Sequence, residues 1–333
     1  MNKLLELIDL NKYNDEPEFK AALVEFFSSL DDEYFINKYH LTAKDIDNII
    51  NPEHIITFDV KWNDDKGVEH INKGYRVQWS SANGPYKGGL RFNPNVNLSV
   101  LKCLAFEQTF KNALTTLPMG GGKGGSNFST KGKSEDEIKR FCYSFMKELY
   151  PYIGAEKDVP AGDLGVGNRE ISYLFDAYKE YTKSSDLGFI SGKPIEKGGS
   201  LCRKEATGYG LVYFLKEVLK LYPIENPRAI VSGSGNVAIY TAEKCLQEGI
   251  QVIGISDSKG YILDENLDLD LIKAIKEVKR GSLSEYPRGY HEGSIYDVDF
   301  VADIALPCAT QNEIDGESAS ILAKNGCYCV SEG

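Results

Sequence analysis

The sequence lacks any long uncharged hydrophobic run, which excludes a secreted protein with a signal peptide and a protein with a membrane-spanning helix. The first residues, MNKLLELIDLNKYNDEPEF, carry acidic side chains among short apolar stretches, and no window resembles a signal peptide or a membrane span. Proline is scarce, with 12 residues in 333, and 42% of the residues are hydrophobic, which excludes a disordered chain. We therefore expect a soluble, cytoplasmic protein of roughly two domains, with no membrane partner.

An excess of basic residues is missing as well. The 38 lysines and arginines are outnumbered by 49 acidic residues, which gives a formal net charge of −11. This balance repels anionic polymers, so nucleic acid is not an expected partner. The seven cysteines are scattered and odd in number, which is typical of reduced thiols. Cys327 and Cys329 are interpreted as neighbours in a strand, and no metal site is predicted.

The first half of the chain has the pattern of an α/β domain. Apolar residues recur at helical spacing over residues 3–50, and alternation over 55–80 around an Asn-Asp-Asp-Lys-Gly turn predicts a β-hairpin. Further helices are predicted over 98–116, 135–149 and 170–179, and a glycine-rich loop is predicted between the first two of these.

The second half alternates strand and helix signals. Strands are predicted over 229–232, 251–256, 301–306 and 327–330, with helices between them that include 269–279 and 317–324. This alternation predicts a Rossmann-like, doubly wound parallel sheet. A polar stretch, 183–200, is interpreted as the connection, which places an N-terminal domain at 1–195 and a dinucleotide-binding domain at 196–333.

A glycine-rich turn follows the first strand of the second half and opens an amphipathic helix. In a G-x-G-x-x-A turn of this kind, small residues allow a tight bend, close approach of a pyrophosphate and close helix packing. A βα turn without a ligand is the alternative. The predicted cofactor contacts in this turn are Gly233, Ser234, Gly235, Asn236, Val237 and Ala238.

The end of the next strand favours NADP over NAD. Asp257 lies where an acid can meet a ribose hydroxyl, and Ser258 follows it. Hydroxyl groups and nearby cations, including Lys279 and Arg280, can accommodate a 2′-phosphate. These two cations are nearly as well explained by the dipole of their own helix, so NAD stays open as the alternative.

Three lysines of the first half have unusual surroundings. Lys87 and Lys123 are flanked by glycines, which remove side-chain bulk, and Lys111 shares a helix face with Gln108. If these lysines converge, they can bind a dianion, and their mutual repulsion lowers their pKa values, as a lysine base requires. The loop around Lys123 fails as a phosphate-binding loop, because Gly124 stands where Ser or Thr is needed.

An aspartate among small apolar residues completes the candidate site. Asp163 lies in Val-Pro-Ala-Gly-Asp-Leu-Gly-Val-Gly, and the alternative role of a helix cap is weakened because the predicted helix starts several residues later. Such a setting can raise the pKa of a carboxyl group, so that it shuttles protons beside a lysine.

Several motifs between Tyr75 and Gly333 together resemble the hexameric glutamate dehydrogenases, within the wider group of amino-acid dehydrogenases. The motifs are GPYKGGLRF, FEQTFKNALTTLPMGGGKGGS, DVPAGDLGVGNREI, GGSLCRKEATGYG, VSGSGNVA and LPCATQNE. The resemblance implies a homohexamer in which an N-terminal substrate and oligomerisation domain precedes the dinucleotide-binding domain. The N-terminal 70 residues match the family only loosely.

The resemblance also implies roles for individual residues. Lys123 is similar to the catalytic lysine that activates the attacking water, and Asp163 to its proton-transferring partner. Lys87 is implied to contact the side-chain carboxylate of the substrate, and Gln108 and Lys111 its α-carboxylate. Gly162 and Arg203 are implied to line the rest of the substrate pocket. Thr207 and Asn236 are implied to contact the cofactor. The implied reaction converts L-glutamate reversibly to 2-oxoglutarate and ammonium, with hydride transfer to NAD(P).

Two alternatives follow from this resemblance. Family members continue past Glu332 and Gly333, so the second domain is expected to be incomplete at its C-terminus, which allows a catalytically impaired binding or regulatory subunit. A dehydrogenase of another amino acid, such as leucine or phenylalanine, is the second alternative. Lys87 argues against an apolar substrate, which would leave its ammonium group unpaired.

Overall fold

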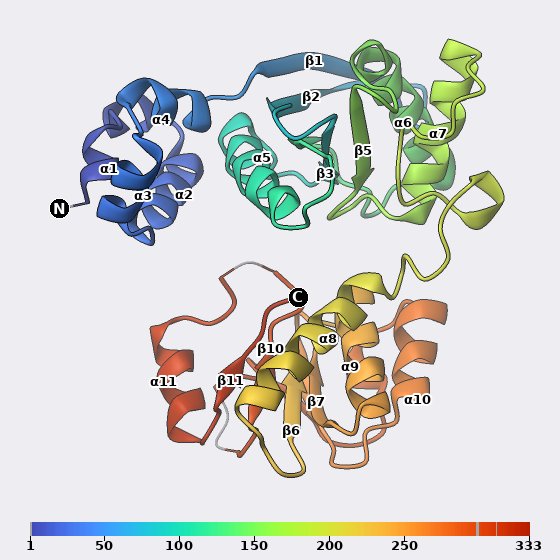
Figure 1. The fold of residues 1–333 in the computed structure, drawn as a ribbon. Coiled ribbons are helices and arrows are strands. Elements are labelled where there is room, and N and C mark those ends of the chain that lie inside the picture. The colour runs from blue at the N-terminus through green and yellow to red at the C-terminus, as the bar shows by residue number, and fades with distance from the viewer. Residues whose placement is uncertain (1, 298–299, 311) are drawn as a thin grey trace. The chain divides into compact units, whose positions relative to one another are not determined.

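The computed structural model describes residues 2–297, 300–310 and 312–333. The chain forms two compact units, Met1–Leu201 and Cys202–Gly333 (Figure 1). The division falls just after the polar stretch 183–200 that the sequence marks as a connection.

The first unit contains a five-stranded sheet in the order β1-β2-β4-β3-β5 (Figure 1). The strands are β1 (His54–Asn63), β2 (Glu69–Ser80), β3 (Tyr86–Phe92), β4 (Gly121–Ser126) and β5 (Asp158–Gly162). Strand β2 is antiparallel to β1 and β4, whereas β3 runs parallel to β4 and β5. The predicted hairpin is confirmed, because β1 pairs along its whole length with β2 around the Asp64–Gly67 turn.

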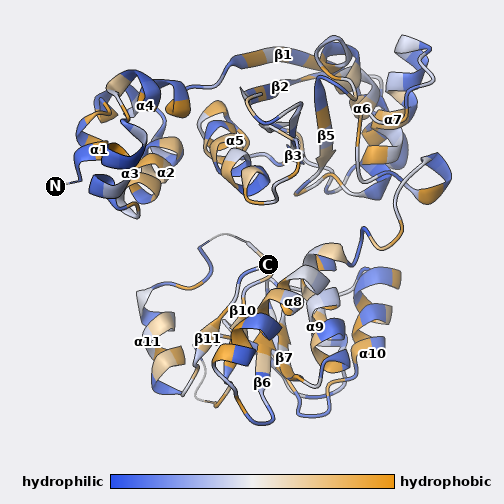
Figure 2. Cartoon of the chain, viewed as in Figure 1, coloured by the Kyte–Doolittle hydropathy of each residue, from blue (hydrophilic) through white to orange (hydrophobic). Residues whose placement is uncertain are grey.

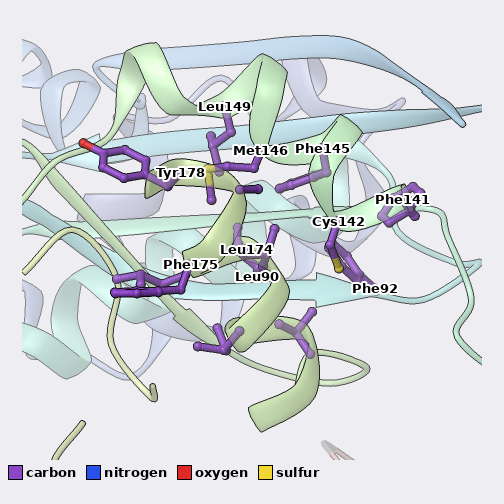
Figure 3. Close-up of a cluster of buried hydrophobic side chains, with 14 of the residues drawn as sticks. Leu90, Phe92, Phe141, Cys142, Phe145, Met146, Leu149, Leu174, Phe175 and Tyr178 are labelled. Carbon is purple, nitrogen blue, oxygen red and sulfur yellow. The ribbon is translucent and has the colours of Figure 1, made fainter. Parts of the chain in front are cut away.

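Helices cover both faces of this sheet. They are α1 (Lys3–Glu6), η1 (Leu10–Tyr13), α2 (Pro17–Ser28), α3 (Asp32–Tyr39), α4 (Ala43–Ile50), α5 (Leu98–Ala113), α6 (Glu135–Leu149), η2 (Tyr150–Tyr152), α7 (Asn168–Thr182) and η3 (Ile195–Lys197). Leu90 and Phe92 of β3 pack against Phe145 and Leu174 of α6 and α7 (Figure 3). A separate cluster joins α5 and the N-terminal helices to Trp79 of β2.

The predicted glycine-rich loop is wrong, because residues 121–126 form the buried strand β4. The strand is stable there because β2 and β3 supply backbone hydrogen-bond partners on its two sides. The glycines of β4 leave room for side chains that pack closely against the strand. A Cβ atom at Gly121 would lie 1.9 Å from Oγ1 of Thr109, and one at Gly124 would lie 3.0 Å from Cδ of Arg76.

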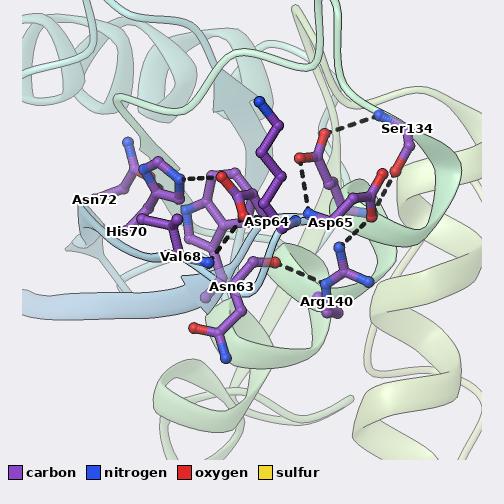
Figure 4. A network of polar contacts seen from close by, with 11 residues as sticks. Asn63, Asp64, Asp65, Val68, His70, Asn72, Ser134 and Arg140 are labelled. Atoms are coloured by element: carbon purple, nitrogen blue, oxygen red, sulfur yellow. Dashed lines mark hydrogen bonds and ion pairs between the residues drawn. The ribbon is translucent and has the colours of Figure 1, made fainter.

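The turn of the hairpin is joined to the start of α6 by polar contacts (Figure 4). Arg140 donates from Nε to the carbonyl oxygen of Asn63 at 2.7 Å and pairs with Asp65 at 2.6 Å. His70 and the backbone N–H of Val68 bind the Asp64 carboxylate, and these hydrogen bonds lower its pKa to about 2. The Arg140–Asp65 pair is exposed at the turn of the hairpin.

The second unit contains a six-stranded sheet in the order β11-β10-β6-β7-β8-β9. The strands are β6 (Arg228–Val231), β7 (Gln251–Ser256), β8 (Gly260–Leu263), β9 (Tyr290–Glu292), β10 (Ile304–Leu306) and β11 (Cys329–Val330). Strands β11, β10, β6 and β7 are parallel, but β8 and β9 are antiparallel to their neighbours. The parallel arrangement predicted for the four strands is confirmed. The antiparallel edge consists of β8 and β9, which sequence reasoning missed, and the 257–259 turn is too short for a crossover helix.

Helices and apolar clusters lie on both faces of the second sheet, as a doubly wound fold requires. The helices are α8 (Ala206–Leu221), α9 (Asn236–Gln247), α10 (Leu269–Lys273), η4 (Ala274–Val278), η5 (Leu283–Glu285) and α11 (Gly316–Lys324). The predicted helix 269–279 changes to a π-helical turn at Ala274. Hydrophobic residues fill the central strands β6, β7 and β10 (Figure 2).

Candidate active site

Three parallel strands of the first unit bring three charged side chains together. Lys123 lies on β4, Arg91 near the end of β3, and Asp163 directly after β5. Leu90 of β3 pairs with Gly124 of β4 and with Gly162 of β5. Lys123, Arg91 and Asp163 are each one residue away from this row of paired residues, so their side chains start close together. The Asp163 carboxylate is the common partner: its Oδ2 atom accepts a hydrogen bond from Nε of Arg91 at 2.8 Å and lies 3.4 Å from Nζ of Lys123.

Burial lowers the pKa of Lys123. Its side chain is only 8% exposed, and desolvation lowers its pKa, although the carboxylate of Asp163 opposes this effect. The positive charges of Arg91 and Lys111 lower the pKa further. The predicted direction for Lys123 is confirmed, but burial contributes more than repulsion between lysines.

The predicted raised pKa of Asp163 is wrong. Burial alone would raise the pKa of this carboxyl group, but the adjacent charges of Lys123 and Arg91 outweigh burial and lower it. The small apolar neighbours in the sequence favour a raised pKa, but Arg91, in the Gly-Leu-Arg-Phe segment far from Asp163 along the chain, reverses this effect. The ionised carboxylate of Asp163 is therefore favoured by its two basic neighbours.

Glycine is needed at position 89 because this site is close-packed. A Cβ atom at Gly89 would lie 2.8 Å from Cβ of Asp163, 2.9 Å from the carbonyl oxygen of Gly162 and 3.4 Å from Nζ of Lys123. Gly162 is similarly restricted, since a Cβ atom there would lie 2.6 Å from the carbonyl oxygen of Val166. The glycines around the lysines therefore make room for other parts of the protein itself.

Lys87 lies at the start of β3 and donates a hydrogen bond from Nζ to Oγ of Ser191 at 2.7 Å. The segment that carries Ser191 is anchored by the fully buried Phe189 and Ile190, and its backbone N–H binds the carbonyl oxygen of Pro160 on β5 at 2.9 Å. Sequence reasoning missed Ser191, because it interpreted 183–200 only as a connection. The buried Phe-Ile pair was the available signal.

The predicted pair on α5 is divided between two environments. Gln108 donates from its amide to Oδ1 of Asn112 at 2.8 Å, while Lys111 is exposed. Asn112, which sequence reasoning missed, in turn donates to the carbonyl oxygens of Lys87 at 3.0 Å and Gly120 at 2.6 Å. Its amide thus fixes the ends of β3 and β4 next to α5.

A fully buried ion pair fixes the strands that carry these residues. Arg76 of β2 donates from Nε to the Asp158 carboxylate on β5 at 2.8 Å, and Nη1 donates to the carbonyl oxygen of Gly88 at 3.2 Å. Gln78 donates to the same carboxylate at 2.9 Å. Both charged side chains are 0% exposed. The long arginine side chain crosses the sheet over the glycines of β4.

In the second unit, the turn after β6 has the geometry that a pyrophosphate requires. Gly233 has a positive φ of 85°, and its N–H binds Oγ of Ser256 at 3.0 Å. Helix α9 begins at Asn236 after Gly235, whose missing side chain leaves the first N–H groups of the helix uncapped. Ala238 is fully buried, so a small residue is needed where α9 meets the sheet. These features fit a dinucleotide phosphate.

The remaining residues of this turn line its surface. Asn236 is exposed, and Ser234 and Val237 are half-buried. Glu313, which sequence reasoning missed, binds the backbone N–H groups of Ala309 and Thr310 at 2.8 and 2.6 Å and also accepts from the hydroxyl of Ser232. This carboxylate therefore holds the segment after β10 beside the turn.

Asp257 has a different environment from the predicted one. Its carboxylate accepts hydrogen bonds from the N–H groups of Lys259 and Leu283, both at 2.9 Å, and lies 3.5 Å from Nζ of Lys276. These contacts hold η5 against the end of β7 and lower the pKa of Asp257 against the effect of burial. The carboxylate already accepts hydrogen bonds from its own chain, so it is not free to accept one from a ribose hydroxyl. Ser258 is exposed in the same turn.

The predicted site residues are divided between the two units. Thr207 is exposed in the first turn of α8, and Arg203 is exposed in the turn before it, so both belong to the second unit.

Within the described ranges, no group of three or more His, Cys, Asp or Glu side chains is arranged to hold a metal ion. No helix in the described part of the chain is long and apolar enough to cross a bilayer.

Comparisons with known proteins give one family for both units. Residues 52–180 match the model described as "Glu/Leu/Phe/Val dehydrogenase, dimerisation domain", and residues 198–333 match "Glutamate/Leucine/Phenylalanine/Valine dehydrogenase". The NAD(P)-specific glutamate dehydrogenase of Xylanibacter ruminicola is 49% identical over 97% of this chain and 74% of its own length. The NADP-specific glutamate dehydrogenase of Helicobacter pylori (strain ATCC 700392 / 26695) is 48% identical over 100% of this chain and 77% of its own length.

Solved structures agree with this assignment. A crystal structure of Plasmodium falciparum glutamate dehydrogenase has a TM-score of 0.92 and 47% identity, and the match covers 99% of this chain and 72% of that one. This structural agreement extends over both units, each of which also matches a family model. The chain therefore belongs to the glutamate, leucine, phenylalanine and valine dehydrogenase family.

Proposed function

We propose that this chain catalyses the reversible oxidative deamination of L-glutamate to 2-oxoglutarate and ammonia, with NADP as the favoured hydride acceptor. The contact between the buried Lys123 amine and the Asp163 carboxylate, 3.4 Å apart, carries the proposal. The names of the similar bacterial enzymes support the same substrate and cofactor.

Lys123 acts as the general base. Burial lowers its pKa, which increases the fraction of neutral amine near neutral pH. The neutral amine takes a proton from the water that attacks the imino carbon of the oxidised substrate. Asp163, at 3.4 Å, stabilises the ammonium form of Lys123, which returns the proton to the substrate nitrogen as ammonia leaves. NADP, when bound, accepts the hydride from Cα of glutamate.

The substrate carboxylates are assigned to the other cations of the first unit. We assign the side-chain carboxylate of glutamate to Lys87, whose ammonium is held by Ser191, and the α-carboxylate to Gln108 and Lys111 on α5. Gly162, next to Asp163, is proposed to line the same site. A dicarboxylate matches this set of donors because each carboxylate meets its own cation.

The environment of Asp257 supports NADP. A free carboxylate at this position would repel a 2′-phosphate, but Lys276 and two backbone N–H groups already neutralise and occupy it. The exposed Ser258 and Lys259 then offer a hydroxyl and a cation, with Lys279 and Arg280 also exposed. We propose Thr207 and the turn 233–238 as the other cofactor contacts.

We also propose that the first domain supports assembly into a homohexamer. The family model that matches residues 52–180 is described as a dimerisation domain. In this proposal residues 1–195 bind substrate and neighbouring subunits, and residues 196–333 bind the dinucleotide.

The test is a set of initial-rate assays that follow the absorbance of the reduced cofactor. Reduction of 2-oxoglutarate with ammonium is measured with NADPH and with NADH, and glutamate is compared with leucine and phenylalanine in the reverse direction. We expect turnover that favours NADPH and glutamate. Lys123→Met should abolish turnover and leave NADPH binding, measured by titration, nearly unchanged. Faster turnover of leucine or phenylalanine would instead identify the alternative substrate class.

A further inference from the structure

Lys123 and Asp163 share their carboxylate oxygen with a third group. Arg91 donates to Oδ2 of Asp163 at 2.8 Å, which is shorter than the 3.4 Å separation between Lys123 and the same atom. Arg91 is 13% exposed and Asp163 23% exposed, so water only partly screens the pair. The shortest of the described charged contacts to Asp163 is therefore made by Arg91, outside the Lys123–Asp163 pair.

Arg91 and Lys123 differ in how readily they lose a proton. A guanidinium group stays protonated at all pH values relevant to catalysis, whereas a buried amine loses its proton readily. When Lys123 becomes neutral, Asp163 still has a cation within hydrogen-bond distance. Without that cation, deprotonation of Lys123 would leave a largely buried carboxylate unpaired, which is unfavourable.

We propose that Arg91 is a positioning residue that keeps Asp163 ionised and permits Lys123 to lose its proton while the site remains paired. This inference rests on the proposed function, because it gives Arg91 a part in the same proton transfer. Arg91 itself does not exchange a proton; the proton moves between Lys123 and water or the substrate nitrogen.

The surrounding charges agree with this assignment. Arg91 repels the charged form of Lys123 and so favours the neutral amine, whereas Asp163 favours the charged form. From α5, Lys111 adds a second positive charge, and Glu107 interacts electrostatically with both Lys123 and Arg91. Removal of the Arg91 charge should therefore leave Asp163 to stabilise the ammonium form of Lys123 more strongly.

The first measurement needs no catalysis. Acetic anhydride is applied to the full chain over a range of pH, and mass spectrometry gives the pH at which Lys123 becomes half-reactive. In Arg91→Gln, which keeps an N–H donor but no charge, we expect that midpoint to rise by about one pH unit, the lower end of the effect of a close charge. Arg91→Lys and the surface variant Arg140→Met should leave the midpoint nearly unchanged.

The second measurement is the pH profile of kcat/KM for glutamate oxidation. In Arg91→Gln the acid limb should shift to higher pH, so that activity is lost mainly at neutral pH and approaches that of the unmodified chain at high pH. An equal loss at every pH, together with an unchanged labelling midpoint, would overturn the assignment and leave Arg91 a structural role only. If Arg91→Gln does not fold, Arg91→Met is labelled in its place.

The two measurements separate this inference from the proposed function. An unmodified chain that does not oxidise glutamate would refute the proposed reaction, while the labelling midpoint still decides whether Arg91 controls the protonation of Lys123. A raised midpoint in Arg91→Gln supports the inference, and an unchanged midpoint in a folded variant contradicts it.

Discussion

Replacing Arg76 with methionine tests whether the buried ion pair fixes the strands under the candidate site. Both Arg76 and Asp158 are 0% exposed, and the substitution removes every arginine hydrogen bond to the Asp158 carboxylate and to Gly88. Gln78 still donates to that carboxylate at 2.9 Å. Breaking a buried pair by removing one partner costs about 3–5 kcal/mol, and the remaining hydrogen bond favours the lower end, about 3 kcal/mol.

The assay is urea unfolding followed by tryptophan fluorescence. The chain has 2 tryptophans, Trp62 and Trp79, and both lie in the first unit, so their emission reports that unit alone. The control is Arg140→Met, which removes the exposed pair with Asp65. A surface ion pair of this kind contributes about 0–1 kcal/mol, so its free energy of unfolding should change little.

A companion variant checks the physical cause. Adding Asp158→Asn to Arg76→Met removes the unpaired buried charge, and the double variant should regain part of the lost stability. The reasoning is refuted if Arg76→Met costs less than about 1 kcal/mol, or if the second substitution adds a full further loss, since neither result fits an uncompensated buried carboxylate.

Three further predictions address packing and thiol reactivity. Gly89→Ala should lower kcat by about 100-fold, because its Cβ would lie 2.8 Å from Cβ of Asp163 and displace the reacting groups; initial rates test this, and near-normal turnover would contradict it. Gly208→Val should destabilise the second unit by roughly 1–3 kcal/mol in thermal unfolding followed by circular dichroism, because a Cβ would lie 2.5 Å from the backbone nitrogen of Thr241; Gly210→Val, in open space on the same helix, controls for helix propensity. With iodoacetamide at mildly alkaline pH, the exposed Cys202 should react in the native protein, whereas Cys245, fully buried and with a pKa raised to about 12, should react only after unfolding, as peptide mass spectrometry would show.

Much of the fold could be predicted because its signals are local. The hairpin 55–80, helix α6 and the alternation of the second half follow from periods of two and 3.6 residues and from a Ser134–Glu137 capping box. Strand β4 could not be predicted in this way. Five of its six residues are glycine or serine, so its burial depends on neighbouring strands that no local pattern reveals.

The candidate site also contains residues with a local sequence signal and residues without one. Lys123 and Asp163 could be singled out because their glycine-rich surroundings are unusual in sequence. Arg91 and Ser191 could not, because each acts through a partner far away in the chain: Arg91 through Asp163, and Ser191 through Lys87. The antiparallel strands β8 and β9 and the internal pairing of Asp257 were likewise outside the reach of local signals.

The sequence by itself determined the residue types and the local elements: two α/β halves, a glycine-rich turn between a strand and a helix, and lysines set among glycines. Only the tertiary structure decided the directions of the pKa shifts in the site. The pKa of Asp163 falls because Arg91 and Lys123 from two neighbouring strands meet its carboxylate, and the pKa of Lys123 falls because the sheet and α5 exclude water from it. Burial and the distances between charges depend on which strands become neighbours, and that information is not carried by any short stretch of sequence.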